Sequence, residues 1–351
     1  MKHIVILCGG QSAEHEVSLL STAAVIRHLD KNKYRVSVVG IGKDGKTLRA
    51  SALLKQLEMG EASLAVSAPE NWVSYLLGLD PESVVVFPVL HGPYGEDGTV
   101  QGLLEVLGLP YVGAGVGPSA VGMNKIHCKS ILQAEGVPVL PWISVSRAEW
   151  DANRAEVVRR AGEELRYPIF VKPANMGSSV GINKSHDETE LQQHLATALR
   201  YDDYVLMEPG IEARELEVSV LGSFTPRASV PGEIVPVDEF YSYEAKYLKE
   251  GTDLLIPALL EQDEVVRLRE LAVQAFQWLQ LEGMARVDFL MDKSSGEIWV
   301  NELNTIPGFT QISMYPKLWK ESGVGYSELL EELIQIGWER HRRRSQFSVE
   351  R

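Results

Sequence analysis

Two short segments in the last quarter of the chain carry polar side chains at a spacing that suits a metal site. Residues 284–291 and 297–304 each alternate apolar and polar residues, which predicts two half-buried β-strands. Between them lies Ser294-Ser295-Gly296, a three-residue connection of the kind that joins a β-hairpin. The sequence therefore predicts a hairpin over residues 284–304.

Pairing across this hairpin brings acidic side chains face to face. The predicted register places Asp288 opposite Glu302 and Arg286 opposite Asn304. Two carboxylates about 5 Å apart across strands destabilise a sheet unless positive charge lies between them. Carboxylate and amide oxygens suit Mg²⁺, which takes a few such ligands together with substrate phosphates. Three interpretations remain open: these oxygens hold a divalent cation, Arg286 neutralises an exposed acidic pair, or the register slips by one residue.

A second group of residues could bind phosphate. Gly177-Ser178-Ser179 lies in a loop of small residues after a predicted strand that ends at Lys172. Consecutive backbone N–H groups and two hydroxyls can surround phosphate oxygens, and the lysine would supply positive charge. Lys125 is a second candidate phosphate ligand. Taken alone, the loop could equally be an ordinary β-hairpin. Lys125, taken alone, could equally be a surface residue with no role in binding.

Two polar segments follow apolar strands, at the carboxyl edge where α/β sheets bind ligands. In the first, Glu14 lies at the start of a predicted helix, where it either stabilises the helix dipole or holds a substrate ammonium group. The second begins with His91 and Gly92. His91 is a candidate proton-handling residue, and a structural hydrogen bond is the alternative role.

Residues 40–47 match the P-loop pattern in full but are better explained as a turn. Asp44-Gly45 between two strand-like runs is typical of a hairpin, and Asp44 would place negative charge in a phosphate cradle. No apolar strand ending in a magnesium-binding Asp follows nearby. We therefore reject a P-loop here.

The charge balance limits the choice of partner. The chain has 34 Lys and Arg against 48 Asp and Glu, a formal net charge of −14. A surface this acidic repels polyanions, so no nucleic-acid partner is expected. A small polyanion such as ATP could bind only where local lysines and a metal reverse the field.

The remaining bulk properties indicate a globular protein of the cytoplasm. No apolar run approaches the roughly 20 residues of a membrane-spanning helix, so no membrane partner is expected. Cys8 and Cys128 are predicted to be buried free thiols, which is typical of a reducing compartment.

These side chains must be positioned by an α/β (mixed α+β) fold, for which we predict three domains. Residues 1–122 alternate strand-like and helical runs, which predicts a Rossmann-like parallel sheet with helices on its faces. Residues 123–223 form the expected central domain, and residues 224–351 the C-terminal domain with a polar loop at 239–252. Strands are expected at residues 4–8, 36–41, 84–90, 169–172, 180–182 and 204–208, and helices at residues 14–29, 99–107, 119–136, 188–201, 263–279 and 326–341.

Six segments together resemble the D-alanine–D-alanine ligases of the ATP-grasp superfamily. They occur in the family's order and the likeness spans roughly residues 4–330, while residues 47–80 match no motif of the family. The segments are GGQSAEHEVS (9–18), HGPYGEDG (91–98), VKPANMGSSVG (171–181), YEAKY (243–247), ARVD (285–288) and NELNTIPGFT (301–310).

The resemblance implies a three-domain ATP-grasp architecture in which ATP lies between the central and C-terminal domains. Lys125, Lys172 and Lys246 would contact ATP, Glu208 with the segment 208–211 would form the adenine hinge, and Glu215 would bind the ribose. Two Mg²⁺ ions, for which Mn²⁺ could substitute, would be held by Asp288, Glu302 and Asn304, with Glu302 bridging. A homodimer is also implied.

The resemblance further implies a ligation through an acyl phosphate, as part of peptidoglycan precursor synthesis. The γ-phosphoryl group would pass to the first D-alanine carboxylate, and the amine of the second D-alanine would displace phosphate. Glu14 would bind the first ammonium group, and Ser178 and Tyr247 would link it to the loop at 239–252. The tetrahedral oxyanion and the second carboxylate would be bound by Arg286, Gly308 and Ser313.

Tyr247 bears on the identity of the second substrate. In the family that the chain resembles, a tyrosine at this position accompanies the use of D-alanine as the acceptor. We therefore expect the dipeptide product. A D-alanine–D-lactate ligase, or another ATP-grasp carboxylate–amine ligase, is the alternative enzyme, and a non-catalytic ATP or amino-acid sensor is the alternative outside enzymes.

Overall fold

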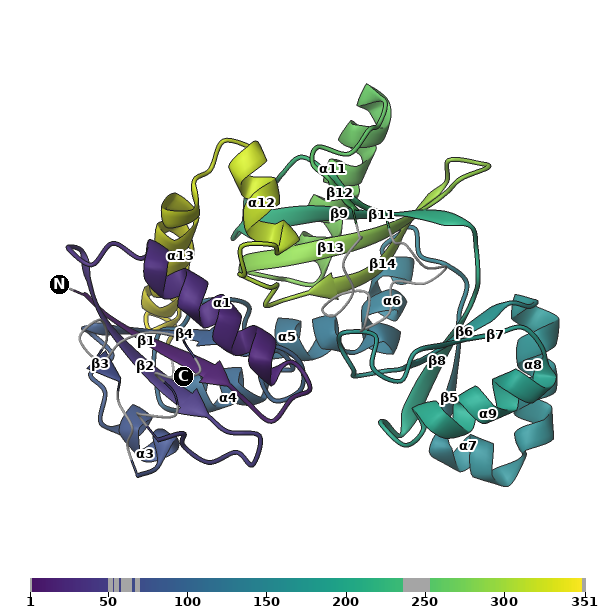
Figure 1. Ribbon diagram of the computed structural model, residues 1–351, viewed down its shortest axis with the longest axis horizontal. Coiled ribbons are helices and arrows are strands. Elements are labelled where there is room, and N and C mark those ends of the chain that lie inside the picture. The colour runs from purple at the N-terminus through teal and green to yellow at the C-terminus, as the bar shows by residue number, and fades with distance from the viewer. Residues whose placement is uncertain are drawn as a thin grey trace.

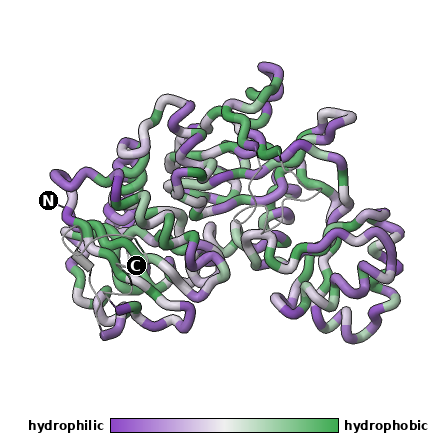
Figure 2. Tube along the Cα trace, in the orientation of Figure 1, coloured by the Kyte–Doolittle hydropathy of each residue, from purple (hydrophilic) through white to green (hydrophobic). Residues whose placement is uncertain are grey.

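The computed structural model describes residues 2–49, 53, 57, 65–66, 70–235 and 253–348. Within these residues the strands form three sheets, each accompanied by helices (Figure 1). Apolar residues concentrate along the strands, most evidently in the N-terminal sheet at the lower left of Figure 2. None of the helices in this part of the chain combines the length and the apolarity that crossing a bilayer requires.

The N-terminal sheet is parallel, as predicted from the alternation of strands and helices. Its strand order is β3-β2-β1-β4, and residues Ile4 to Cys8 in its centre are fully buried. A strand buried on both faces needs a continuous apolar run, which is what the sequence supplies there. The elements of this part are β1 (Lys2–Gly9), α1 (His15–His28), β2 (Tyr34–Ile41), β3 (Ala65–Val66), α3 (Trp72–Leu77), β4 (Val84–Val89) and α4 (Thr99–Val106).

The segment that matches the P-loop pattern forms a turn. The Gly42 N–H donates to the Lys46 carbonyl at 2.7 Å, and Ile41 pairs with Thr47 in an antiparallel bridge. Gly45 has a φ of 77°, a conformation that glycine adopts without a steric penalty. The turn that the sequence analysis favoured is therefore confirmed.

The helix expected over residues 119–136 is two helices, so that expectation is wrong. α5 (Val116–Met123) ends at Asn124, whose backbone is extended, and α6 (Lys125–Ala134) begins directly afterwards. The Asn124 side chain accepts a hydrogen bond from the His127 N–H and so caps α6. The break turns the start of α6 toward residue 174, because the Lys125 N–H donates to the Ala174 carbonyl.

The central sheet is antiparallel, with the order β5-β8-β6-β7. The return strand expected at residues 180–182 is wrong in position, because β7 begins only at Asn183. Ser178, Ser179 and Gly181 have φ values of 49°, 59° and 73°, and three left-handed residues do not fit a strand. The elements are β5 (Ile143–Ser146), α7 (Arg147–Ala152), α8 (Arg154–Leu165), β6 (Ile169–Pro173), β7 (Asn183–Ser185), α9 (Glu188–Ala198) and β8 (Tyr204–Pro209).

The third sheet has six strands and contains the predicted hairpin. Its order is β12-β11-β9-β13-β14, and β10 pairs with Val220 and Leu221 near the C-terminal end of β9. Helix α11 packs its apolar side against β9 and β13. The elements are β9 (Ala213–Gly222), β10 (Arg227–Ala228), β11 (Gly232–Val235), β12 (Asp253–Leu255), α11 (Gln262–Trp278), β13 (Gly283–Asp292), β14 (Ile298–Asn304), α12 (Met314–Glu321) and α13 (Tyr326–Arg344).

The hairpin has the predicted pairing at its polar end and a different turn at the other. Asp288 pairs with Glu302 and Arg286 with Asn304, as predicted. The prediction of a three-residue loop is wrong. The Asp292 N–H donates to the Glu297 carbonyl, so the connection between the strands has four residues. The register shifts by one beyond Asp288, where Asn301 is the extra residue of a β-bulge. The bulge compensates for the longer turn and keeps the carboxylates opposed.

Helix α13 returns to the beginning of the chain and covers one face of the N-terminal sheet (Figure 1). Leu329, Leu330 and Leu333 of α13 are fully buried in the same apolar core as Ile4 and Val25. At the other end of the helix, Arg340 donates to the carbonyls of Gly113 and Tyr111 and lies 4.1 Å above the Tyr111 ring.

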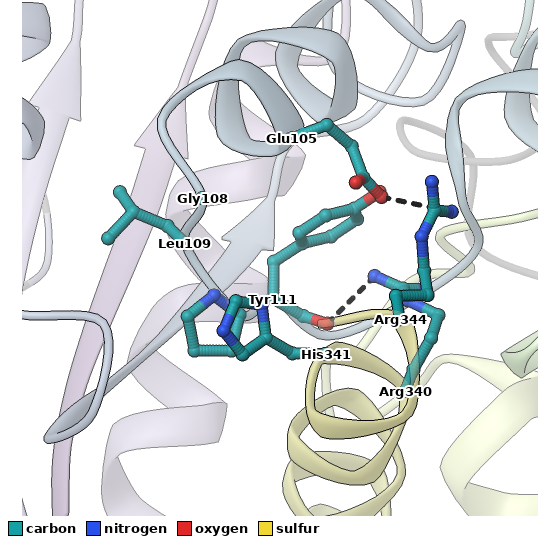
Figure 3. A pocket seen from close by; sticks show the side chains of 8 residues that line it. Glu105, Gly108, Leu109, Tyr111, Arg340, His341 and Arg344 are labelled. Carbon is teal, nitrogen blue, oxygen red and sulfur yellow. Dashed lines mark hydrogen bonds and ion pairs between the residues drawn. The ribbon is translucent and has the colours of Figure 1, made fainter. Parts of the chain in front are cut away.

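A small cavity lies where this end of α13 meets the segment after α4 (Figure 3). Its side chains largely satisfy one another: the Tyr111 hydroxyl donates to Glu105 at 2.8 Å, and Arg344 lies 3.4 Å from the same carboxylate. The cavity therefore belongs to the contact between α13 and the N-terminal sheet.

Candidate functional site

A row of three carboxylates crosses three neighbouring strands. Glu217 on β9 lies opposite Asp288 on β13, which in turn lies opposite Glu302 on β14. Arg286 is placed among them: its Nε is 3.0 Å from Glu217 Oε2, and its Nε and Nη2 donate to the two oxygens of Asp288 at 2.7 and 2.6 Å. The bidentate contact fixes the plane of the guanidinium.

Charge compensation in this row comes from two cations. Burial lowers the pKa of Arg286, but the carboxylates of Asp288 and Glu217 outweigh it and hold that pKa well above its ordinary value. Lys125 lies 3.3 Å from Glu302, the other carboxylate of the pair. The neutralising role considered for Arg286 is therefore present in the structure, and it extends to Glu217.

The residues proposed as metal ligands fit a hard cation by their chemistry. Asp288 and Glu302 are paired directly, and the Asn304 amide reaches Asp288 Oδ2 at 3.0 Å. Oxygen donors of this kind suit Mg²⁺. Across the described ranges of the chain, no group of three His, Cys, Asp or Glu side chains is already arranged as a metal site. The metal assignment therefore depends on the opposed carboxylates and the amide.

Lys172 lies at the end of β6, in contact with residues from two other strands. Its Nζ is 2.6 Å from Glu208 Oε2 on β8 and 3.1 Å from Asn301 Oδ1, the extra residue of the bulge on β14. The second oxygen of Glu208 contacts Lys129 of α6. Lysines 125 and 172, expected to contact the same nucleotide, thus lie on elements joined by direct polar contacts.

The electrostatics of this cluster are set by burial and by Glu208. Burial raises the pKa of Glu208, but Lys129 and Lys172 outweigh it and lower that pKa below its ordinary value. For Lys172 burial lowers the pKa, and the carboxylate of Glu208 outweighs it and raises that pKa. The pair formed by Lys172 and Glu208 is therefore ionised.

Glu14 and Ser178 are far apart in the sequence and in contact in the structure. The Ser178 hydroxyl donates to Glu14 Oε1, and Glu14 lies at the start of α1. A Cβ at Gly177 would come within 2.9 Å of Glu14 Oε2, and one at Gly92 within 2.8 Å. Two glycines therefore make room for this carboxylate, and the contact joins the small-residue loop to the N-terminal part.

His91 is held by both of its ring nitrogens. Its Nδ1 lies 2.9 Å from the Ile306 carbonyl, which can only accept, so Nδ1 carries the hydrogen. Its Nε2 lies 3.0 Å from the Ser21 hydroxyl, which also accepts the Phe309 N–H. Burial lowers the pKa of His91 and keeps the ring neutral. This is the bonding pattern of a structural hydrogen bond, and the proton-handling role stays a prediction.

Glu96 is a buried carboxyl group beside these residues for which the sequence suggested no role. Its Oε1 accepts the Gly92 N–H at 2.7 Å, its Oε2 lies 3.4 Å from the Ile306 N–H, and its carbonyl accepts the Thr305 hydroxyl. Burial, with the charge of Glu14, raises the pKa of Glu96 to about 8. Glu96 therefore links the loop after β4 to the segment after β14.

Gly308 and Ser313 lie on that same segment and face each other. The Ser313 hydroxyl accepts the Thr310 N–H at 3.0 Å, and a Cβ on Gly308 would come within 2.7 Å of that hydroxyl. Glycine at position 308 thus lets the segment fold tightly at the start of α12.

A small cavity is lined by several of these groups. It is bounded by side chains from all three parts of the chain: Glu96, Gly122, Met123, Lys125, Met176, Gly177, Glu302, Leu303, Asn304 and Thr305. Glu215 lies on β9 two pairs beyond the pairing of Glu217 with Asp288, with Leu290 as its partner on β13, and its charge raises the pKa of Lys172. Tyr247, Lys246 and the polar loop at 239–252 lie outside the described residues.

Besides Glu96, three residues of the site were not identified from the sequence. Glu217 and Lys129 act across long-range contacts, so the only local signals are the alternation of β9 and the one-turn spacing of Lys129 from Lys125. Asn301 precedes the predicted ligand Glu302, but the bulge that turns it toward Lys172 has no recognisable signal.

Comparison with known proteins identifies the family. Residues 3–114 match the family model described as the D-ala D-ala ligase N-terminus, and residues 131–335 match that of the D-ala D-ala ligase C-terminus. The chain is 49% identical to a D-alanine–D-alanine ligase of Thermoanaerobacter sp. (strain X514), over 97% of both chains. It is 44% identical to that of Heliobacterium modesticaldum, over 99% of this chain and 98% of the relative.

Solved structures agree with the sequence comparison. The D-alanine–D-alanine ligase from Coxiella burnetii superposes with a TM-score of 0.83 at 36% identity, covering 98% of this chain and 96% of that one. The VanG D-Ala:D-Ser ligase from Enterococcus faecalis superposes with a TM-score of 0.81 at 32% identity, covering 96% and 99%. The predicted mixed α/β class of the ATP-grasp type is confirmed, and the chain belongs to the D-alanine–D-alanine ligase family.

Proposed function

We propose that this chain joins two D-alanine molecules at the expense of ATP, through a D-alanyl phosphate, in the synthesis of peptidoglycan precursors. The observation that carries the proposal is that Lys125, Glu302 and Gly177 line one cavity, and that Gly177 lies directly beside the Glu14–Ser178 pair. Lysine charge suits a nucleotide polyanion, and a buried carboxylate suits an amino-acid ammonium group. An ATP-dependent carboxylate–amine ligase needs both within reach of one reacting carboxylate.

The reaction activates a poor electrophile. A carboxylate oxygen of the first D-alanine attacks the γ-phosphorus of ATP, and the bond between that phosphorus and the bridging oxygen breaks to release ADP. The amine of the second D-alanine, having lost a proton, attacks the carbonyl carbon of the mixed anhydride. Phosphate leaves with the electrons of its C–O bond, and a peptide bond remains.

The chain's own residues bind and orient the reactants in this scheme. Glu14, oriented by the Ser178 hydroxyl, holds the first ammonium group. Arg286 and the Gly308 N–H stabilise the tetrahedral oxyanion, because preorganised donors act strongly where water is excluded. Ser313 binds the second carboxylate, Lys125 and Lys172 the phosphates, the segment at Glu208 the adenine and Glu215 the ribose.

Magnesium, with Mn²⁺ as a possible substitute, belongs to this proposal. Asp288, Glu302 and Asn304 are the residues that would hold two ions. When bound, the ions would supply positive charge that neutralises the transferring phosphoryl group. Arg286, already paired with Asp288, would limit the repulsion between the carboxylates in the absence of nucleotide.

The acceptor is proposed to be D-alanine. The curated relatives named above are D-alanine–D-alanine ligases, whereas one structural neighbour is a D-Ala:D-Ser ligase. Tyr247 supports D-alanine, but it lies outside the described residues, as does Lys246, proposed to contact ATP. D-lactate is the remaining alternative.

The domain limits, the assembly and the location are also proposals. Three sheets support division at residues 1–122, 123–223 and 224–351, although the pairing of β9 with β13 favours a second boundary before Ala213. A homodimer follows only from resemblance. Dependence on ATP and two buried free cysteines support a cytoplasmic location.

The test is a substrate-dependence assay. The protein is incubated with ATP and Mg²⁺, and ADP, phosphate and product are measured with D-alanine alone or with D-alanine plus D-serine or D-lactate. The proposal expects ADP release that requires D-alanine and yields the dipeptide. Release only with another acceptor would change the specificity, and no release with any amino acid would overturn the function.

A further inference from the structure

Lys129 is a fully buried lysine that the scheme above does not use. It lies on α6 one helical turn after Lys125, and its side chain is 2% exposed. Its Nζ contacts Glu208 Oε1, while Glu208 Oε2 contacts Lys172 at 2.6 Å. One carboxylate, itself 1% exposed, therefore serves two lysines that arrive from different elements.

The cluster of these three side chains carries more positive than negative charge. Removing an ammonium group from water is costly, and burial lowers the pKa of Lys129 even beside Glu208. Within the described part of the chain, Glu208 is the only side chain that forms an ion pair with Lys129. Glu302 and Glu215 also act on Lys172 through their charges and raise its pKa, whereas the charge that most strongly favours a protonated Lys129 is that of Glu208.

This excess charge has a consequence for Lys172. A carboxylate paired with a single lysine cancels most of its charge, but a carboxylate shared between two leaves a net charge of about +1 on the cluster. Lys172 is the more exposed of the two lysines, at 12% against 2% for Lys129, so the uncompensated charge is presented there. In a chain with a net charge of −14, such a local excess is what a polyanion requires.

The contacts also fix the position of Lys172. Glu208 is held from behind by α6, and Asn301 on β14 accepts a hydrogen bond from Lys172 at 3.1 Å. Lys172 is thus located by Glu208 of the central sheet, which α6 holds in turn, and by Asn301 of the six-stranded sheet. A displacement of Glu208 would move Lys172 directly.

We propose that Lys129 is a positioning residue for nucleotide binding: by sharing Glu208 it leaves Lys172 charged and in place for the phosphates of ATP. The inference rests on the proposed function, which identifies the nucleotide as ATP. The effect of Lys129 on nucleotide affinity should have the same direction whichever molecule is the second substrate. Lys129 itself remains buried behind Glu208 and touches no substrate.

The first test is Lys129→Met, which keeps the length of the side chain and removes its charge. Lys172 then faces a carboxylate that it alone must satisfy. We expect the KM for ATP to rise about tenfold, which is about 1.4 kcal/mol of binding free energy, with kcat at saturating ATP and the KM for D-alanine within about threefold of the parent. Lys320→Met, at an exposed position of α12, is the control and should change none of these values.

A charge-restoring double variant separates this role from damage to the fold. Glu208→Gln combined with Lys129→Met leaves Lys172 beside a neutral amide, so the cluster again carries about +1. We expect Lys129→Met to raise the KM for ATP far less in the chain that also carries Glu208→Gln than in the parent chain. Equal effects in the two chains would overturn the inference, since a merely structural lysine would show no such coupling.

The outcomes for the proposed function and for this inference can be told apart. D-alanine-dependent ADP release by the parent chain tests the function. If the parent is active and Lys129→Met binds ATP with unchanged affinity in calorimetry while remaining folded, the inference alone is wrong. If the parent does not release ADP, ATP affinity in calorimetry still tests the inference, and a tenfold loss in the variant would support it.

Discussion

Arg286 contacts Asp288 and Lys125 contacts Glu302, and this arrangement determines which residues can be changed without loss of the fold. Each carboxylate of the pair has a cation close by, so removal of one negative charge does not leave an acidic group alone in the interior. Substitutions here should therefore affect chemistry more than stability.

Glu302→Gln is the sharpest test of the metal assignment. The amide keeps the shape of the side chain but weakens the affinity for a divalent cation, so kcat should fall more than about a hundredfold. The midpoint of thermal unfolding should change by only a few degrees. Steady-state ADP release and a thermal melt measure the two quantities.

Glu297→Gln provides the matched control, because Glu297 lies exposed in the turn of the same hairpin. It should leave both quantities unchanged. A Glu302→Gln enzyme that turns over at the parent rate would remove Glu302 from the site.

The raised pKa of Glu96 predicts how the free energy of unfolding changes with pH. Its pKa is about 8 in the folded protein and 4.5 in its ordinary state, with burial as the main cause. Between these values the folded state holds a proton that the unfolded state has released. The contribution of Glu96 to the free energy of unfolding should therefore be full below about pH 4.5 and be lost as the pH rises to about 8, with a slope of at most about 1.4 kcal/mol per pH unit.

Glu96→Gln removes this titration, because the amide stays neutral at every pH. Urea denaturation at several values from about pH 5 to 9 should give a shallower loss of stability in the variant than in the parent. Parallel curves would show that Glu96 does not hold a proton in the folded state.

At the scale of single elements, local patterns predicted what local forces determine. The pairing of Asp288 with Glu302 followed from the period of two in both strands and from a short turn, and the structure confirms it. The bulge at Asn301 could not be foreseen, because it reflects how β14 fits its neighbours. The left-handed residues Ser178 and Ser179 were equally hidden, since serine does not favour that conformation.

For the helices, the features that could not be predicted from the sequence are those that depend on long-range contacts. The spacing of Lys125 and Lys129 places both on one face of α6, but the sequence does not say that this face meets Glu208. Likewise α12 and the break at Asn124 depend on tertiary contacts, among them the bond from the Lys125 N–H to Ala174. The family resemblance, not periodicity, led to the substrate residues.

The turn between Ile41 and Thr47 provides a test at this scale. Lys46 is 82% exposed and lies 3.9 Å from Asp44, so Lys46→Ala should leave kcat and the KM for ATP within about twofold of the parent. Lys172→Ala, assayed in parallel, should lose most of the activity. Loss of activity in Lys46→Ala would support a P-loop nucleotide site at residues 40–47 and contradict the site described above.

At the scale of the whole molecule, helix α13 ties the C-terminal elements to the N-terminal sheet. Its buried leucines share a core with β1 and α1, and Lys33 of the N-terminal part pairs with Glu331 at 2.8 Å. The exposed ion pair adds little, whereas the apolar contact contributes most of the stability of this junction.

Leu333→Ala should therefore destabilise the protein by about 2–5 kcal/mol, because Leu333 is fully buried and its truncation leaves a cavity. The shift in urea midpoint measures the loss. Leu259→Ala removes the same atoms from a side chain that is 77% exposed and should have little effect. Similar small shifts for both variants would mean that α13 does not close this core.

The return of α13 also has a consequence during synthesis on the ribosome. Strands β1, β2 and β4 emerge early together with α1, yet the core on the face that α1 covers is complete only when residues 326–337 have been made. Until then the nascent N-terminal part exposes apolar surface that a later segment must cover, so it is a natural client for chaperones that bind growing chains. Contacts this distant in sequence also slow folding, because the intervening loop must close first.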